Sequence, residues 1–215
     1  MQTLALVAGG PLEELPDLNA FNNEETKWIG IDKGLLYIIN AGIDPYHAFG
    51  DFDSISDSEK ENLKKLSPQL SIFSAEKDKT DTELALDWAV QQQEYSKIIL
   101  FGATGGRIDH MLGNIQLLIK YKNINKTIEV IDRQNQMRLY QPGTYEMKKL
   151  ADKKYISFLP VSEKVKGITL KGFKYPLTSC QIELGSTLCI SNELIHQAGT
   201  FSFLDGILLG IRSKD

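Results

Sequence analysis

Aspartate, glycine and arginine residues gather in three short motifs in the first part of the chain. These are GDFDS at residues 50–54, DKTD at residues 78–81 and GATGGRIDH at residues 102–110. Together they contain five aspartates within about sixty residues. Carboxylate oxygens are the protein ligands that Mg²⁺ takes when it also binds substrate phosphates. The motifs therefore indicate a site in which a divalent metal holds a polyphosphate.

The two aspartates of GDFDS stand two residues apart. In an extended chain Asp51 and Asp53 point to the same side, so both carboxylates can bind one cation, and Gly50 allows close approach of the backbone. A turn with two solvated acids is the alternative, and a lone pair of this kind favours it. The metal interpretation therefore depends on the other two motifs.

DKTD stands at the expected start of a helix. Residues 80–83 match a capping box, with Thr80 as the cap. Because the helix dipole stabilises negative charge at this end, capping alone explains one acid here. The alternative is that Asp81 faces the Gly50 loop and completes the metal site, with Asp78 nearby.

GATGGRIDH places three glycines between an expected strand and an expected helix. The amides of such a loop, together with the helix N-terminus, bind anions, and Gly105 is one of these glycines. Arg107 adds a bidentate phosphate donor, and Asp109 can orient Arg107, hold a second metal, or bind a ribose or an amine. A tight turn that needs glycine for its backbone is the alternative. The motif matches neither a P-loop nor GxGxxG.

Short strands alternate with helices up to about residue 132. Expected strands cover residues 3–8, 28–31, 47–49, 71–73, 97–101 and 127–131, and expected helices cover residues 35–41, 56–66, a segment from residue 80, and residues 109–122. This alternation predicts a three-layer, Rossmann-like α/β domain with a mostly parallel sheet. Ligands of such sheets bind beyond the carboxyl ends of the strands. The residues expected on that edge are Asp32, Asp51, Asp53, Asp81, Gly105 and Asp109.

The helices that follow DKTD and GATGGRIDH each have an expected apolar face. In the first helix the face contains Leu84, Trp88 and Gln91, widened by Ala85 and Ala89. In the second it contains Leu112, Ile115, Leu118 and Ile119. We expect these faces to pack against the sheet.

The pattern changes after Asp132. Strand-like segments follow at residues 137–140, 143–147, 155–160, 166–170, 188–191, 198–203 and 207–211, separated by glycine turns and without a convincing helix. This spacing predicts an antiparallel β-sandwich or partial barrel. We therefore expect two domains, at residues 1–133 and 134–215.

Composition excludes several classes of function. A net charge of −4 gives no electrostatic footprint for nucleic acid or an anionic membrane. The start, MQTLALVAGG, lacks the features of a signal peptide, and no stretch reaches the roughly 18 apolar residues of a membrane span. Cys180 and Cys189 lack CxxC spacing, so we expect reduced thiols and a cytoplasmic protein. The three histidines are scattered, which argues against covalent catalysis.

The motifs and their order resemble the thiamine pyrophosphokinases. The resemblance rests on AGGP, GIDKG, GDFDSI, DKTDTELAL, GATGGRIDH and a late SNEL at residues 191–194, and it covers nearly the whole chain. It implies transfer of the pyrophosphoryl group from ATP to the hydroxyethyl oxygen of thiamine with Mg²⁺, giving thiamine diphosphate and AMP. It also implies a homodimer, with each active site between the α/β domain of one subunit and the β domain of the other.

Motif by motif, the resemblance also implies roles for single residues. The implied Mg²⁺ ligands are Asp51, Asp53 and Asp81. The implied ATP and phosphate residues are Asp32, Asp78, Thr80, Gly105, Arg107 and Asp109, and the implied thiamine residues are Ser191 and Asn192. Two departures concern the thiamine end. Leu194 stands where the family motif has an aromatic residue, and both tryptophans, Trp28 and Trp88, lie early in the chain.

Phosphoryl-type transfer depends on positioning and charge neutralisation, with little covalent work for the protein. The catalytic candidates are therefore the carboxylates Asp51, Asp53, Asp81 and Asp109, of which Asp81 or Asp109 can accept the alcohol proton. Two other functions stay open: a pyrophosphokinase for another alcohol, such as a hydroxymethyl pterin, and a nucleotide- or thiamine-binding regulator. The number of aspartates argues against the regulator.

Overall fold

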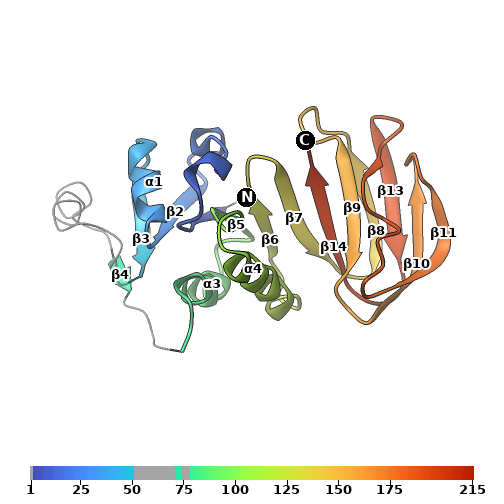
Figure 1. Ribbon diagram of the computed structural model, residues 1–215. Helices are drawn as coiled ribbons and strands as arrows, with labels where there is room; N and C mark the ends of the chain where they lie inside the picture. The colour runs from blue at the N-terminus through green and yellow to red at the C-terminus, as the bar shows by residue number, and fades with distance from the viewer. Residues whose placement is uncertain (1, 51–70, 74–77) are drawn as a thin grey trace. The chain divides into compact units, whose positions relative to one another are not determined.

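Six short apolar segments form the sheet of the first part of the chain. They are β1 (Thr3–Val7), β2 (Thr26–Ile31), β3 (Pro45–Phe49), β4 (Ser71–Phe73), β5 (Lys97–Phe101) and β6 (Thr127–Ile131). All pair in parallel, in the order β6-β5-β1-β2-β3-β4 (Figure 1). The computed structural model describes residues 2–50, 71–73 and 78–215, and the chain divides into two units, Met1–Arg133 and Gln134–Asp215.

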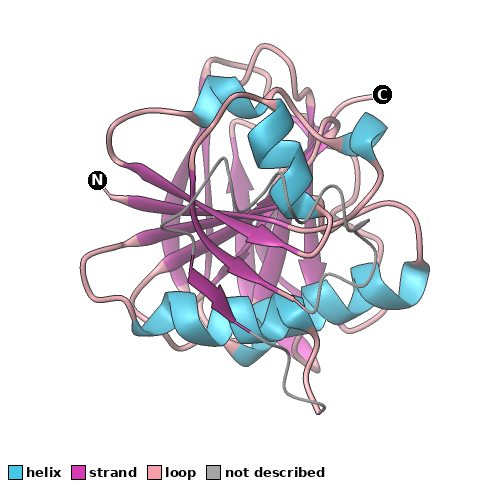
Figure 2. Cartoon of the chain, turned by 90° about the vertical axis from the view of Figure 1, so that its left-hand side faces the viewer, coloured by secondary structure: helices cyan, strands magenta, loops and turns pink. Residues whose placement is uncertain are grey.

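Helices cover both faces of this parallel sheet (Figure 2). They are α1 (Gly34–Asn40), α3 (Asp81–Gln91) and α4 (Ile108–Lys120), with short 3₁₀ turns at Leu12–Glu14 and Leu18–Phe21. On one face, Trp28 of β2 and Ile38 of α1 belong to one core cluster. On the other, the Trp88 ring of α3 lies 5.9 Å from the Phe49 ring of β3, and α4 packs beside α3. The sheet is therefore the middle of three layers.

The start of α3 matches the predicted capping box only in part. Thr80 is the N-cap, and its hydroxyl accepts the amide N–H of Glu83 at 3.2 Å. The Glu83 carboxylate accepts a hydrogen bond from Lys120 of α4 at 2.8 Å. The reciprocal half of the box is thus wrong, because a bond between helices engages the carboxylate. The helix predicted over residues 56–66 lies outside the described residues.

The buried faces of α3 and α4 match the predicted faces only in part, at Ala85, Ala89 and Leu118. The buried side chains of α3 are Ala85, Leu86 and Ala89, and those of α4 are Leu117 and Leu118. Leu84 and Trp88 are only half-buried, and Leu112 is 53% exposed. Both helices have apolar residues on more than one side, so periodicity alone does not define their rotation. Packing on the sheet decides it.

Eight strands form the second unit. They are β7 (Asn135–Tyr140), β8 (Gly143–Lys148), β9 (Tyr155–Pro160), β10 (Lys164–Lys171), β11 (Leu177–Glu183), β12 (Asn192–Glu193), β13 (Ala198–Phe203) and β14 (Leu208–Ser213). All pair antiparallel, in the orders β12-β9-β14-β7 and β11-β10-β13-β8. The ring centres of Phe158 and Phe201, one from each group of strands, lie 4.5 Å apart in a shared apolar core. The predicted fold class, a parallel-rich α/β unit followed by an antiparallel β-sandwich, is confirmed.

Two details of the second unit correct the sequence prediction. The predicted strand at residues 188–191 is wrong, since this segment forms turns in which Leu188 is 61% exposed. Strand β11 was not predicted, because only Ile182 of its side chains is buried and the pattern hardly alternates. β11 is an edge strand, where polar residues are tolerated on both faces.

Both cysteines are free thiols, as predicted. Cys180 is half-buried and Cys189 is buried, and burial raises the pKa of the Cys189 thiol to about 11. That thiol therefore stays protonated and unreactive near neutral pH. Within the described residues, no helix has the length and apolar character needed to cross a membrane.

Candidate active site

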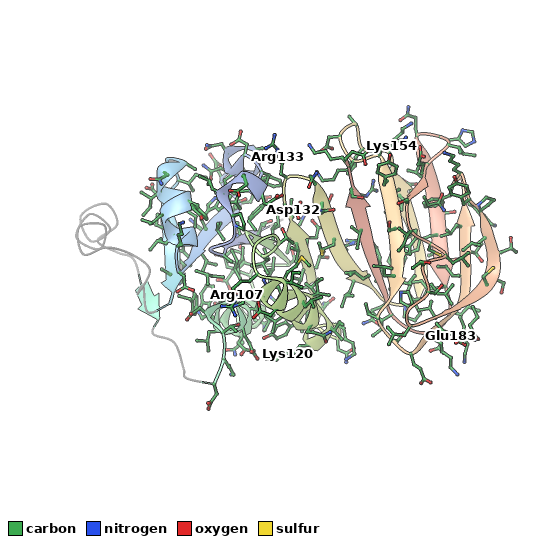
Figure 3. The ribbon with its side chains drawn as sticks, in the orientation of Figure 1. Arg107, Lys120, Asp132, Arg133, Lys154 and Glu183 are labelled. Carbon is green, nitrogen blue, oxygen red and sulfur yellow. The ribbon has the colours of Figure 1, made fainter. Side chains whose placement is uncertain are left out.

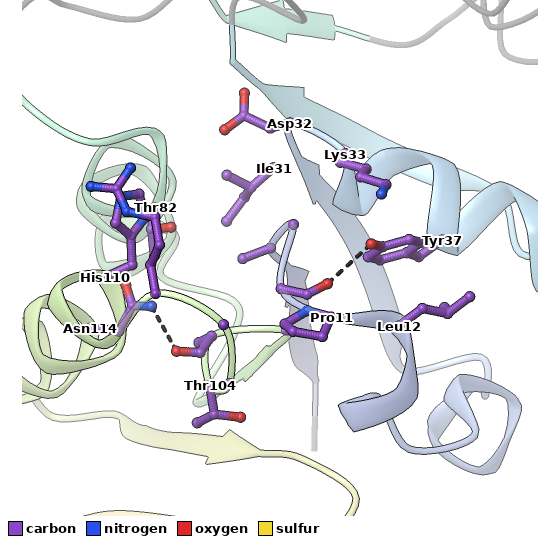
Figure 4. A pocket seen from close by; sticks show the side chains of 18 of the residues that line it. Pro11, Leu12, Ile31, Asp32, Lys33, Tyr37, Thr82, Thr104, His110 and Asn114 are labelled. Atoms are coloured by element: carbon purple, nitrogen blue, oxygen red, sulfur yellow. Dashed lines mark hydrogen bonds between the residues drawn. The ribbon is translucent and has the colours of Figure 1, made fainter. Parts of the chain in front are cut away.

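A pocket of about 860 Å³ opens at the carboxyl ends of β1, β2 and β5 (Figure 4). The strand order places it where the direction of chain progression reverses, with β2 and β3 on one side of β1 and β5 and β6 on the other. At such a switch point the loops after neighbouring strands diverge and leave room for a ligand. The pocket is thus on the edge that the sequence indicates.

Two glycine loops form much of the pocket lining. Residues 9–11 follow β1, and residues 102–107 follow β5. The Gly10 N–H donates to the Gly102 carbonyl at 3.0 Å, which joins the loops. Gly102 has a φ of +62°, and a Cβ at this position would overlap the carbonyl oxygen of Ala8. Glycine is therefore required here both for its left-handed backbone and for the close approach of the β1 loop.

Side chains from two helices hold the carbonyls of these loops. Tyr37 of α1 donates its hydroxyl to the Gly10 carbonyl at 3.0 Å. Asn114 of α4 donates from Nδ2 to the Ala103 carbonyl at 2.9 Å. Both bonds are drawn as dashed lines in Figure 4. The two helices lie on opposite faces of the sheet, so the loops are held from both sides.

Asp32 lies at the end of β2, on the rim of the same pocket. Its φ of +49° is left-handed, a conformation that aspartate adopts more readily than most residues. Its N–H donates to the Phe49 carbonyl at 2.9 Å, and a Cβ on Gly50 would overlap its Oδ1 atom. Gly50 directly precedes the predicted metal ligand Asp51. Asp32 and the start of GDFDS therefore share one corner of the sheet edge.

Arg107 and Asp109 form an exposed bidentate ion pair at the start of α4. Arg107 Nε donates to Asp109 Oδ1 at 3.1 Å, and Nη2 donates to Oδ2 at 2.5 Å. The pair lowers the pKa of Asp109 to about 2 and raises the pKa of Arg107. Asp109 therefore stays ionised near neutral pH and is a weak proton acceptor. Of the roles open from the sequence, this geometry favours orientation of Arg107.

The start of α3 reaches the pocket through Thr82, which lines it. Asp81, the first residue of α3, is half-buried, whereas Asp78 and Thr80 are exposed. A carboxylate at this position is stabilised by the amides of the first helical turn. Asp81 is thus placed on a helix N-terminus, directly before a residue that lines the pocket, whereas Asp78 precedes the helix.

A polar cluster on the far part of α3 holds this helix against α4. Asp87 accepts hydrogen bonds from the Tyr121 hydroxyl at 2.6 Å and from Lys120 at 3.2 Å, and it pairs with Lys79 at 3.2 Å. Burial, and then the bond to Asp87, raise the pKa of Tyr121 to about 12. Lys120 lies at the opposite end of α4 from Arg107 (Figure 3). The cluster therefore fixes DKTD and both helices from outside the pocket.

In the second unit, the SNEL segment is held by hydrogen bonds to the backbone. Ser191 has a left-handed φ of +56°, and its N–H donates to Ser157 Oγ at 3.0 Å. Asn192 is buried, and its Oδ1 accepts the amides of Tyr175 at 3.1 Å and Glu193 at 2.9 Å. Its Nδ2 donates to the Tyr175 carbonyl at 2.8 Å. Asn192 thus positions Tyr175, whose side chain is exposed.

Two family models match the chain. The model for the thiamin pyrophosphokinase catalytic domain matches residues 18–131, and the model for the thiamin pyrophosphokinase vitamin B1 binding domain matches residues 144–208. A thiamine pyrophosphokinase of Bacillus subtilis (strain 168) is 54% identical over 215 residues, which is 100% of both chains. The chain belongs to the thiamine pyrophosphokinase family. The family predicted from the motifs is confirmed.

Solved structures of thiamine pyrophosphokinases have the same fold. The crystal structure of the Bacillus subtilis enzyme superimposes with a TM-score of 0.97 at 54% identity, covering 100% of both chains. That of Geobacillus thermodenitrificans gives a TM-score of 0.93 at 52% identity, covering 100% of this chain and 98% of the other. A family protein from Enterococcus faecalis gives 0.88 at 37% identity, covering 100% of both chains. The likeness extends over both units.

The site of this thiamine pyrophosphokinase-family chain offers oxygen donors suited to Mg²⁺. Asp32 beside Gly50 and Asp81 at the start of α3 are carboxylates of the kind that this ion prefers. Within residues 2–50, 71–73 and 78–215, no three His, Cys, Asp or Glu side chains are close enough to hold a metal. Asp51 and Asp53 lie outside the described residues. The donor chemistry therefore fits Mg²⁺, and the complete ligand set stays a prediction.

The predicted site residues other than Asp51 and Asp53 fall into three groups. Those that line the pocket are Asp32, Gly105 and Arg107. Asp81 and Asp109 directly precede the lining residues Thr82 and His110, and Asp78 and Thr80 come before α3. Ser191 and Asn192 lie in the second unit. Three residues of the predicted nucleotide side thus line one pocket, and the role of each stays a prediction.

Several pocket residues escaped the sequence analysis. Lys33 lines the pocket, and a basic residue directly after a strand end is a signal that could have identified it. Tyr37 and Asn114 lie inside helices and have no motif that distinguishes them from core or surface residues. Thr104 donates to the buried Asp132 carboxylate at 2.7 Å, across two neighbouring strand ends. Only the folded chain brings these partners together.

Proposed function

We propose that the chain transfers the pyrophosphoryl group of ATP to the hydroxyethyl oxygen of thiamine, giving thiamine diphosphate and AMP. The main support is the pocket of about 860 Å³ at the switch point of the sheet, formed by two glycine loops. Its size lies within the range of pockets that enclose nucleotide-sized ligands. Backbone amides and the lining residues Lys33 and Arg107 provide positive charge for a polyphosphate in a chain of net charge −4.

Arg107 has a defined role in this proposal. Its Nε and Nη2 atoms face Asp109, which leaves the Nη1 side of the guanidinium for phosphate oxygens. Asp109 holds the guanidinium in that orientation and stays ionised. The ion pair therefore argues against Asp109 as the acceptor of the alcohol proton. Asp32, Asp78, Thr80 and Gly105 complete the proposed ATP and phosphate site.

The proposed metal is Mg²⁺, held by Asp51, Asp53 and Asp81 with Asp32 at the same corner. In such a site the ion neutralises phosphate charge and stabilises the departing AMP. The chain itself supplies the carboxylates, and Gly50 lets the segment pass close to Asp32.

The proposed thiamine site includes Ser191, Asn192 and Tyr175 of the second unit. The sequence left open which aromatic residue stacks on the pyrimidine ring. Tyr175 is 57% exposed, and Asn192 holds its backbone through two hydrogen bonds. A fixed backbone with an exposed ring suits stacking on a flat heterocycle.

We also propose a cytoplasmic homodimer in which the second unit of one subunit completes the site of the other. Two free cysteines are compatible with a reducing compartment. Large apolar side chains of the second unit are exposed, among them Leu184, Leu188 and Leu204. Exposed apolar residues of this size are typical of contact surfaces when they cluster. Sedimentation velocity tests the dimer, and a fully active monomer would overturn the shared site.

The first test is an incubation of the purified chain with ATP, Mg²⁺ and thiamine, followed by chromatography of nucleotides and thiamine species. We expect AMP and thiamine diphosphate in equal amounts, and we expect EDTA to stop both. Absence of both products from folded protein would contradict the proposal. AMP formed only when another alcohol replaces thiamine would keep the reaction type and change the acceptor.

A further inference from the structure

In the two pocket loops, the carbonyl groups of Gly10, Gly102 and Ala103 accept hydrogen bonds from within the protein. The Gly10 carbonyl accepts from Tyr37, and the Ala103 carbonyl accepts from Asn114. The Gly102 carbonyl accepts from the Gly10 amide. Each of these three carbonyl oxygens of the lining is therefore engaged by a donor.

The loop amides are in the opposite situation. Gly9, Gly105 and Gly106 are exposed, and no acceptor for their N–H groups is found in the part of the chain that the structure describes. Gly105 and Gly106 have left-handed φ values of +75° and +61°. Successive amides in such conformations form concave sites for anions. The amides of these three glycines are thus open to a ligand, whereas the carbonyls of Gly10, Gly102 and Ala103 are engaged within the protein.

We propose that Tyr37 and Asn114 are positioning residues that keep loop carbonyls turned away from the bound polyphosphate. This inference rests on the proposed function and concerns the same pocket. Glycine-rich loops can rotate their peptide groups at little steric cost, so an untethered carbonyl can turn towards the ligand. A carbonyl oxygen facing a phosphate oxygen is repulsive, and the tethers prevent this arrangement.

Tyr37 supports the phosphate side of the pocket in two ways. Its ring is buried in the α1-side core, so the hydroxyl has a defined position beneath the Gly10 loop. The ammonium group of Lys33, another lining residue, lies 5.8 Å from the centre of the same ring. The ring face attracts a cation at this distance. One side chain therefore orients both a loop carbonyl and a positive charge.

Asn114 acts from the opposite helical layer. It stands four residues after His110 and seven after Arg107, so all three share one side of α4, and all three line the pocket. Its amide is half-buried and reaches the loop that precedes its own helix. The bond links the β5 loop to α4 and keeps the spacing between loop amides and Arg107.

The test compares Tyr37→Phe and Asn114→Leu with matched controls. Phe keeps the buried ring and Leu keeps the approximate shape of Asn, so each variant loses mainly a donor. Tyr145→Phe removes a tyrosine bond to the Gln141 carbonyl at 2.8 Å, and Asn19→Leu removes an asparagine bond to the Ala41 carbonyl at 3.2 Å. The controls lose the same kinds of hydrogen bond, but neither Tyr145 nor Asn19 lines the pocket at the ends of β1, β2 and β5.

Steady-state kinetics and calorimetric titration with inorganic pyrophosphate and Mg²⁺ provide the readouts. We expect each pocket variant to raise the KM for ATP and the Kd for pyrophosphate by about 3- to 10-fold, the usual effect of one lost hydrogen bond. Because the contact serves ground state and transition state alike, kcat should stay within about 2-fold. The KM for thiamine and both control variants should be unchanged.

Two results would overturn the inference. One is an unchanged pyrophosphate Kd in both pocket variants. The other is a fall in kcat and melting temperature with no selective effect on ATP, which would indicate a structural role only. If the unmodified chain forms no AMP but its pyrophosphate affinity still depends on Tyr37 and Asn114, the proposed function fails and the positioning role stands.

Discussion

The two units of the chain use backbone-binding polar side chains for different purposes. In the first unit, Tyr37 and Asn114 bind loop carbonyls, which leaves exposed loop amides in the lining beside Lys33 and Arg107. In the second, Asn192 binds the backbone of Tyr175, and the surface left exposed is an aromatic ring. Amides suit a charged polyphosphate, whereas a ring suits a flat heterocycle. The comparison teaches that a polar motif residue can act through the backbone beside it.

The largest effect on activity is expected at the proposed metal ligands of the first unit, and it should exceed any effect of a substitution in the second unit. Asp53→Asn should lower kcat by about 100- to 1000-fold, because charge stabilisation by a bound metal contributes several kcal/mol to the transition state. The melting temperature should change little. Ser191→Ala in the second unit should affect mainly the KM for thiamine. Near-normal turnover of Asp53→Asn or Asp51→Asn would remove the metal assignment.

A matched pair of glycines, one in each unit, tests whether ATP binding depends on backbone geometry in the first unit and not in the second. Gly102 and Gly206 both have positive φ, +62° and +95°, and a Cβ on either would overlap a carbonyl oxygen. Gly102→Ala and Gly206→Ala should each lower the free energy of unfolding by about 2–3 kcal/mol, as measured by urea denaturation. Only Gly102→Ala should also raise the KM for ATP. An equal rise in the KM for ATP in both variants would contradict this difference between the units.

The aromatic half of the comparison depends on Tyr175. Tyr175→Ala should raise the KM for thiamine by about 10-fold through loss of stacking, with the KM for ATP unchanged. Tyr175→Phe should restore normal kinetics, because the ring rather than the hydroxyl makes the contact. Initial rates at varied thiamine and fixed ATP check this. If Tyr175→Phe raised the KM for thiamine as much as Tyr175→Ala, the contact would be a hydrogen bond of the hydroxyl rather than stacking of the ring.

The smallest effect concerns the pH dependence of the Arg107–Asp109 pair. The pKa of Asp109 is lowered to about 2 from an ordinary value of 3.8, so the carboxylate is ionised throughout the neutral range. The pair therefore contributes stability above about pH 4 and loses it as the pH falls towards 2. Asp109→Asn should lower kcat/KM a few-fold and leave the inflections of the pH–rate profile between pH 5 and 9 unchanged. A lost inflection would make Asp109 the base.

The sequence by itself determined the fold class and the loops that bear the chemistry. Alternating strands and helices, glycine after strand ends and a Thr cap are local features, and each depends on residues within one turn or one strand. That is why the cap at Thr80, the loop at Gly102 and the change to antiparallel strands after Asp132 were predictable. The family followed from the same motifs.

Only the tertiary structure decided which partners those local elements acquire. Tyr37 binds a carbonyl 27 residues away in the sequence, and Thr104 binds an aspartate 28 residues away. Glu83 binds Lys120 of α4 instead of closing the capping box of its own helix. The rotation that exposes Leu112, and the edge position that makes β11 polar, likewise depend on packing between distant segments. Local sequence has no record of such contacts, because burial and hydrogen-bond competition arise only when separate elements meet.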